Sequence, residues 1–169
     1  TISVTDLSSI AVSGVNVMVH GFSEVTDTNG EVDLPLLVAG SNVSADDGTY
    51  GVSDVISPPG GTLQLPVIPS TGPWVIPMGV HAVLIGNNYT APAGDDVTIS
   101  TAASLTLKNA HLSVPSGDII VEGSGKLIGN NGSTDAVVRT TGAHAIEGIG
   151  AGLTVQNDFH HGCSWVEHV

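Results

Sequence analysis

Residues 97–128 read VTISTAASLTLKNAHLSVPSGDIIVEGSGKLI, and their rhythm indicates the fold class. Short segments of alternating apolar and polar residues recur at 97–99, 105–107, 112–114, 119–121 and 126–128. Alternation of this kind places every second side chain on one face of a β-strand. The segments begin seven or eight residues apart, which leaves no room for a crossover helix. The stretch therefore predicts either a meander of hairpins or the flat faces of a β-helix or β-prism.

The composition of the whole chain favours strands in the same way. Its 169 residues include 22 Gly and 9 Pro, and only 4% are aromatic. Small and β-branched side chains with frequent turn formers are typical of many short strands joined by tight turns. The best helical candidate, 143–153, is interrupted by Gly148, Gly150 and Gly152. The sequence predicts an all-β protein.

Charge limits the kinds of partner. Sixteen acidic residues against three basic ones give a formal net charge of −13, which disfavours binding to nucleic acid or to an anionic membrane. No run of 18 apolar residues is present, so no membrane-spanning segment is expected. The acidic pairs Asp46-Asp47 and Asp95-Asp96 have two interpretations: they keep the surface soluble, or they hold Ca²⁺ or face a basic partner.

Two domains are expected, with a proline-rich connector between them. The first, 1–68, is predicted to be a small β-sandwich, 69–78 the connector, and 79–169 a repetitive β domain. Trp74 in the connector is expected to pack as a plug between the halves, or otherwise to be an exposed ligand platform. Strands in the first domain are expected at Ile2–Val4, Val15–Val19, Glu24–Thr26, Glu31–Leu34, Ser41–Ala45, Tyr50–Val55 and Thr62–Val67.

One stretch of the first domain carries a family pattern. Residues 14–19 read GVNVMV and residues 25–36 read VTDTNGEVDLPL, which predicts strand, loop, strand, tight turn and strand, with Asn29-Gly30 supplying positive φ. This pattern over 14–36 resembles β-sandwich modules of the carboxypeptidase regulatory-like and collagen-binding-repeat type. The resemblance implies an immunoglobulin-like sandwich and no activity. The lysine that isopeptide-forming members need is absent here.

An internal repeat marks the second domain. Leu-Ile-Gly-Asn-Asn occurs at 84–88 and again at 127–131, a shift of 43 residues. The repeat suggests two equivalent turns of one architecture, and the alternative is two unrelated hairpin turns. A solenoid of few coils with small side chains buries little by itself, so we expect a homotrimer that shares one core.

The C-terminal segment holds the clearest candidate ligands. His160, His161, Cys163 and His168 fall within nine residues, and this C-terminal His/Cys cluster could bind Zn or Fe. The alternatives are a polar terminal strand that docks through its apolar residues, and a histidine pH switch. A single cysteine excludes an intrachain disulfide. The other histidines, His20, His81, His111 and His144, are expected to be structural, and no cofactor is expected.

No catalytic motif is found: a G-x-S-x-G elbow, an H-E-x-x-H pair and a Walker loop are all missing from the sequence, so the protein is not expected to be an enzyme. An acidic, two-part, all-β chain resembles the accessory structural proteins of tailed bacteriophages. That resemblance implies a capsid decoration protein on the virion exterior, bound as a homotrimer to the major capsid protein or a tail protein. The alternative is a tail spike, fibre or adhesin module that binds a host receptor or glycan.

Overall fold

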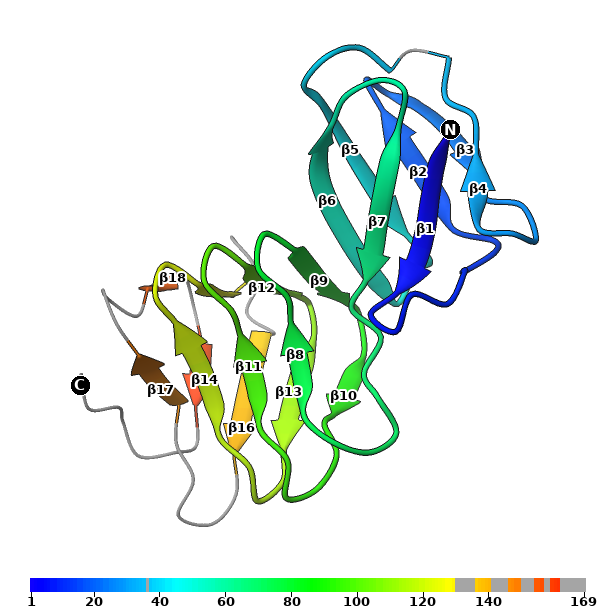
Figure 1. Ribbon diagram of the computed structural model, residues 1–169. Helices are drawn as coiled ribbons and strands as arrows, with labels where there is room; N and C mark the ends of the chain where they lie inside the picture. Colours follow the sequence, from blue (N-terminus) through cyan, green and yellow to red (C-terminus); the bar gives the residue numbers. More distant parts are fainter. Residues whose placement is uncertain (36, 130–135, 141–145, 150–153, 157–158, 162–169) are drawn as a thin grey trace. The chain divides into compact units, whose positions relative to one another are not determined.

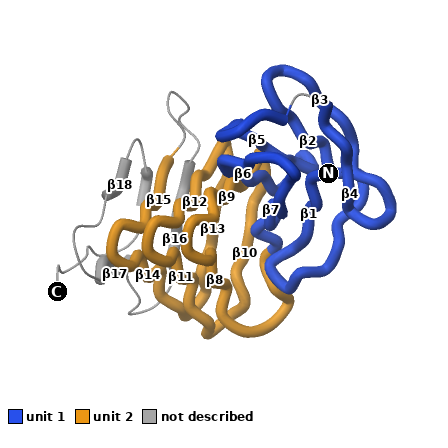
Figure 2. The backbone as a smooth tube through the Cα atoms, turned by 45° about the horizontal axis from the view of Figure 1, so that its top comes forward, with its two compact units in different colours: residues 1–67 blue, residues 68–169 orange. Residues whose placement is uncertain are grey.

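The computed structural model describes residues 1–35, 37–129, 136–140, 146–149, 154–156 and 159–161 (Figure 1). The all-β prediction is confirmed, because the described residues form strands and turns and no helix. The chain divides into two compact units, Thr1–Val67 and Ile68–Val169, which Figure 2 colours separately. The division lies one residue before the end of the predicted first domain.

Unit 1 contains seven strands in two sheets. They are β1 (Ile2–Asp6), β2 (Asn16–Val19), β3 (Phe22–Val25), β4 (Glu31–Val32), β5 (Ser41–Asp46), β6 (Tyr50–Ile56) and β7 (Gly61–Leu65). One sheet has the order β4-β1-β7, and in the other β3, β2, β5 and β6 are neighbours in that order. All pairs in the unit are antiparallel except β1 with β7. Each of the seven expected strands has a counterpart.

The core of unit 1 is made of aliphatic side chains from alternate strand positions. In β2, Val17 and Val19 are buried while Met18 between them is 42% exposed. Strand β5 shows the same alternation, and the buried aliphatic residues of β1, β5, β6 and β7 are Ile2, Val4, Val43, Ala45, Val52, Ile56, Leu63 and Leu65. These buried side chains hold the two sheets together, whereas the four residues of β3 are all exposed. The immunoglobulin-like topology remains a prediction.

The turn at 27–30 differs from the expected hairpin. Strand β3 pairs with β2, whereas β4 pairs with β1 in the other sheet, so this turn carries the chain between sheets. Gly30 has φ +73°, as the Asn-Gly signal predicts. A Cβ at Gly30 would lie 2.6 Å from the carbonyl oxygen of Val4, so the crossing also needs the absence of a side chain.

Unit 2 winds through three strands and then repeats. Its strands are β8 (Trp74–Ile76), β9 (His81–Ile85), β10 (Asn88–Thr90), β11 (Val97–Ile99), β12 (Ser104–Lys108), β13 (His111–Val114), β14 (Ile119–Glu122), β15 (Lys126–Gly129), β16 (Ala136–Thr140), β17 (Ile146–Ile149), β18 (Thr154–Gln156) and β19 (Phe159–His161). Every strand pairs in parallel with the strand three places along the chain (Figure 1). We call each set of three strands a coil. A meander of hairpins would give antiparallel pairs, so the stacked alternative fits the pairing.

From β8 to β14 and from β9 to β15, the coils contain 22 or 23 residues. His81 pairs with Ser104, and Ser104 pairs with Lys126, giving steps of 23 and 22. The repeated Leu-Ile-Gly-Asn-Asn does not follow these steps. Leu84 pairs with Leu107, whereas Leu127 pairs with Leu105, so the two copies are out of register by two residues. The interpretation of the two copies as equivalent turns was therefore wrong in register.

The interior of unit 2 is filled by its own chain. Its fully buried side chains include Trp74, Ile76, Leu84, Ile99, Leu105, Leu107, Leu112, Ile119 and Leu127. A single chain thus buries these residues without a neighbouring chain, so the reason given for a shared trimeric core does not apply to them. Trp74 lies in β8, inside the range predicted as a connector, and its side chain is 0% exposed. It is therefore not an exposed ligand platform.

Candidate functional site

The C-terminal His/Cys cluster is described only in part. His160 and His161 lie in β19, where they pair in register with Val137 and Val138. Cys163 and His168 lie outside the described residues. Among the residues that are described, no three His, Cys, Asp or Glu side chains form a group that could hold a metal ion. Metal binding by this cluster stays a prediction.

The acidic pair in unit 2 is used by the backbone. The carboxylate of Asp95 accepts the N–H of Gly72 at 3.1 Å, and that of Asp96 accepts the N–H of Asp118 at 2.9 Å. These bonds connect residues 22 or 23 positions apart, so they link successive coils at one corner. Charged acceptors of backbone N–H groups make strong hydrogen bonds. These two carboxylates therefore connect the corners of neighbouring coils.

The second acidic pair closes a hairpin in unit 1. Asp47, between β5 and β6, accepts the N–H groups of Thr49 and Tyr50 at 2.8 and 2.7 Å. Asp46 accepts the N–H of Gly48 at 3.2 Å. An aspartate that bonds to its own backbone in this way stabilises a tight turn. Both pairs therefore have structural partners.

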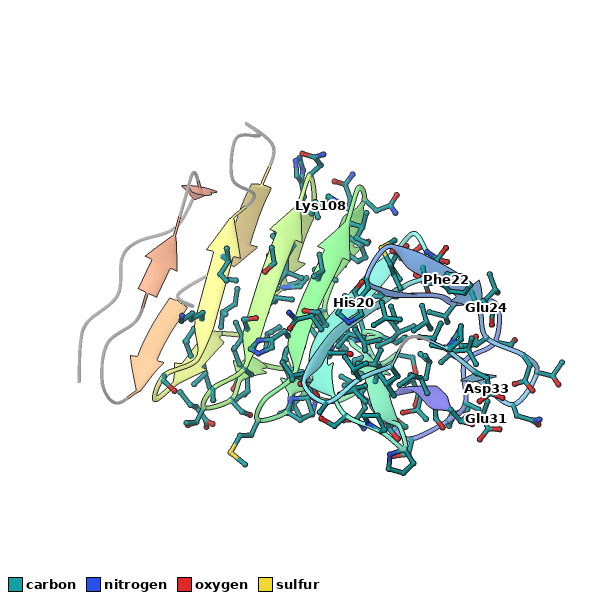
Figure 3. The ribbon with its side chains drawn as sticks, turned by 90° about the horizontal axis from the view of Figure 1, so that it is seen from above. His20, Phe22, Glu24, Glu31, Asp33 and Lys108 are labelled. Carbon is teal, nitrogen blue, oxygen red and sulfur yellow. The ribbon has the colours of Figure 1, made fainter. Side chains whose placement is uncertain are left out.

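Other exposed carboxylates gather on one side of unit 1. Figure 3 shows Glu24 of β3 on the same side as Glu31 and Asp33. Hydrogen bonds from the Thr1 hydroxyl and amino terminus, with the charge of that amino group, lower the pKa of Asp33. The pKa of Asp27, in the turn before β4, is also lowered, because its carboxylate accepts the backbone N–H groups of Glu31 and Asn29.

Two of the histidines expected to be structural have hydroxyl partners. His20 Nε2 lies 3.2 Å from Ser41 Oγ in unit 1. His81 Nδ1 lies 2.9 Å from Ser104 Oγ on the outer face of unit 2. His111 is exposed in β13, and His144 lies outside the described residues. The contact of His81 differs from that of His20, because it belongs to a concave part of the surface.

A depression lies on the outer face of the sheet formed by β9, β12 and β15. It has a volume of about 430 Å³, and its lining is His81, Ala102, Ala103, Ser104, Ser124, Lys126 and Ile128. We call it the β9–β12–β15 depression. Its polar lining comes from three consecutive coils, because His81, Ser104 and Lys126 are in register across three parallel strands. The volume is in the range of small-molecule sites, roughly 300–1,000 Å³.

The side chains of this depression are suited to binding. Ser104 is only 8% exposed and is hydrogen-bonded to His81, while His81 and Lys126 are exposed residues. A serine next to a histidine can act as a nucleophile when a third group orients the base. The residues that line the depression, all of them described, include no carboxylate for that purpose. The arrangement therefore offers hydrogen-bond donors and a positive charge.

The sequence does contain a signal for this site that the 43-residue repeat obscures. Pro92-Ala-Gly-Asp95 and Pro115-Ser-Gly-Asp118 are similar and lie 23 residues apart. Taken as the coil length, that spacing brings His81 beside Ser104. The next step then brings Ser104 beside Lys126.

Comparison with known proteins adds no assignment to this geometry. The residues that the structure describes include no helix long and apolar enough to cross a membrane. No protein-family model, no curated protein and no solved structure matches this chain.

Proposed function

We propose that the protein is a non-enzymatic structural protein of a virus particle, acting as a capsid decoration protein on the exterior of the shell. The observation that carries this proposal is the stacking of unit 2, in which parallel strands connect every coil to the next. Such a stack presents regular, rigid outer faces, which suit packing against a protein lattice. The net charge of −13 keeps a surface protein soluble and away from nucleic acid.

A homotrimer remains part of this proposal, on a different ground from the one that the sequence suggested. Because one chain already buries Leu105, Leu107 and their neighbours, the trimer is not needed to complete that core. Its support is symmetry: capsids offer threefold and quasi-threefold positions, and a trimer can occupy one with three equal contacts. The partner would be the major capsid protein or a tail protein.

A second candidate function is a tail spike, fibre or adhesin module that binds a host receptor or glycan. The observation that favours it is the β9–β12–β15 depression, which is concave and lined by donors. Trp74 cannot contribute to a sugar platform, because it is 0% exposed. A binding role would therefore depend on polar side chains of the sheet face.

The test of both candidates is to find where the protein lies on virus particles. Antibodies raised against the recombinant chain are used for immunogold labelling of virions from the source of the gene. We expect label on the outside of intact virions. Label at the shell supports the decoration protein, and label confined to the tail supports the second candidate. Particles that never carry label, and that lack the chain by mass spectrometry, would refute both.

Oligomeric state is measured separately, by light scattering after size exclusion. A mass of three chains is the expected result for the decoration protein. A monomer at all concentrations would exclude the trimer, and co-sedimentation with empty shells would then test whether the monomer binds them.

A further inference from the structure

Two of the three basic residues of the chain lie on one sheet face, and Arg139 lies in β16 of another sheet. Lys108 and Lys126 lie in β12 and β15, and both side chains are exposed (Figure 3 labels Lys108). Strands β9, β12 and β15 contain no Asp or Glu. The only ion pair found among the described residues is between the Thr1 amino group and Asp33. Neither lysine forms an ion pair with a described carboxylate, so both ammonium groups are available to an anionic ligand.

Lys126 lies beside three side chains that can form hydrogen bonds with a ligand. Lys126 lines the β9–β12–β15 depression with His81, Ser104 and Ser124. The bond of 2.9 Å between Ser104 Oγ and His81 Nδ1 fixes the orientation of the imidazole. When the hydroxyl donates in this bond, the neutral ring carries its proton on Nε2, which is then a donor for a ligand. The imidazole and the Lys126 side chain come from the two strands that flank β12, and both line the depression beside Ser104.

The rest of the lining decides what else the ligand must carry. Ala102, Ala103 and Ile128 supply apolar surface, and Ser124 supplies a hydroxyl. The Ser124 hydroxyl already accepts the N–H of Ala102 at 3.2 Å, so it remains free to donate. About 430 Å³ is more than one small inorganic anion fills. A carboxylate on a hydroxylated ring with an apolar face meets all of these features.

We propose that the β9–β12–β15 depression binds a sugar acid, with its carboxylate on Lys126 and His81 and its hydroxyls on the serines. The inference rests on the second candidate function, and it names the class of ligand which that function requires. The sugar acid can be a free monosaccharide or a residue of a longer acidic glycan, since both present the same carboxylate. Lys108 lies outside the lining and contributes only to the general attraction of the face.

The test is titration of the full chain at low ionic strength, followed by backbone amide NMR shifts. The probes are glucuronate, trigalacturonate, neutral glucose and sulfate. We expect saturable shifts at residues of the depression with the two sugar acids. Tighter binding of trigalacturonate than of glucuronate identifies a glycan chain as the natural source, whereas equal binding identifies the single sugar acid.

Two matched lysine variants separate a site from general charge. Lys126→Ala should weaken sugar-acid binding about tenfold or more, because it removes a charged hydrogen-bond donor. Lys108→Ala, which removes the same charge from the same face, should change it less than about twofold. Unchanged circular dichroism spectra are required for both variants.

Several results would overturn the inference. They are no saturable binding of either sugar acid, equal binding of glucose, equal binding of sulfate, or equal weakening by the two lysine variants. Virion labelling in the absence of sugar-acid binding would refute the inference alone and leave the virion location standing. Sugar-acid binding without virion labelling would support the site and refute the proposed location.

Discussion

Replacing Leu105 with Ala tests whether unit 2 is held together by a core of its own. Leu105 of β12 is 0% exposed and pairs in register with Ala82 and Leu127. The substitution removes the equivalent of three buried methylene groups at about 0.8 kcal/mol each, or about 2.4 kcal/mol in all. The paired strands on both sides limit collapse into the space left, and the cavity raises the expected loss to about 3–4 kcal/mol.

The assay uses the fluorescence of Trp74 during urea unfolding. The chain has two tryptophans, so a Trp165→Phe background leaves Trp74 as the only one. Its side chain is fully buried in unit 2, and its emission therefore reports the unfolding of that unit. The matched control is Thr106→Ala, on the adjacent outward position, where we expect a loss below about 1 kcal/mol.

Two results would refute the reasoning. A loss for Leu105→Ala that is as small as that of Thr106→Ala would mean that the side chain is not packed as described. An unfolding midpoint that rises with protein concentration would mean that other chains complete the core, because only association makes the midpoint depend on concentration.

Three further predictions concern a corner of unit 2, the turn at 27–30 in unit 1 and the C-terminal His/Cys cluster. Gly117→Ala should lower the free energy of unfolding by at least about 2 kcal/mol, because the new Cβ would overlap the carbonyl oxygen of Asp95. Gly94→Ala, at φ +82° with open space around it, should lower it by only about 1 kcal/mol. Equal losses for the two variants in urea unfolding would contradict the overlap. The pKa of Asp27 is lowered in the folded protein, so its contribution to stability is present above about pH 4 and is lost as the pH falls through the pKa of the folded state. Asp27→Asn should flatten that part of the pH dependence of the unfolding free energy. Identical acid unfolding profiles for the two proteins would contradict this contribution. If the C-terminal His/Cys cluster binds metal, elemental analysis should find stoichiometric Zn or Fe that a chelator removes with a loss of stability, and a metal-free protein of unchanged stability would exclude it.

Local structure was predictable because each strand carries its own alternation. The segments 97–99, 105–107, 112–114, 119–121 and 126–128 all lie within strands of unit 2. Alternation depends only on neighbouring residues, so it can be read without knowing what the strand pairs with. The same holds for the seven strands of unit 1.

Pairing was not predictable in the same way, because it depends on contacts between distant residues. The turn 27–30 has the residues of a hairpin, yet β3 and β4 join different sheets. Trp74 looked like a connector residue because prolines surround it, although three residues between Pro73 and Pro77 suffice for β8. The prolines limit the length of that strand without preventing it.

The β9–β12–β15 depression could not be found from any local motif. Its residues are ordinary one by one, and they come together only through coil steps of 23 and 22 residues. The Leu-Ile-Gly-Asn-Asn repeat has a period of 43 residues, which is two residues shorter than the two coil steps together. A coil length taken from that repeat therefore does not align His81, Ser104 and Lys126. The site depends on the register, and the 23-residue spacing of the two Pro-x-Gly-Asp corners indicates only the first of its two steps.

Coil steps range from 22 residues (Ser104 to Lys126) to 28 residues (Lys126 to Thr154) while the strands stay paired in register, so unit 2 can change in length by whole coils. A duplication or deletion of 22 or 23 residues would lengthen or shorten the stack by one coil and leave every remaining inward side chain facing inward. The insertion or deletion of one residue within a strand would instead move every later side chain of that strand to the opposite face of the sheet. Natural variation in the length of this unit is therefore expected in whole coils or at the corners, and a protein engineer could set the length of the stack by the same rule.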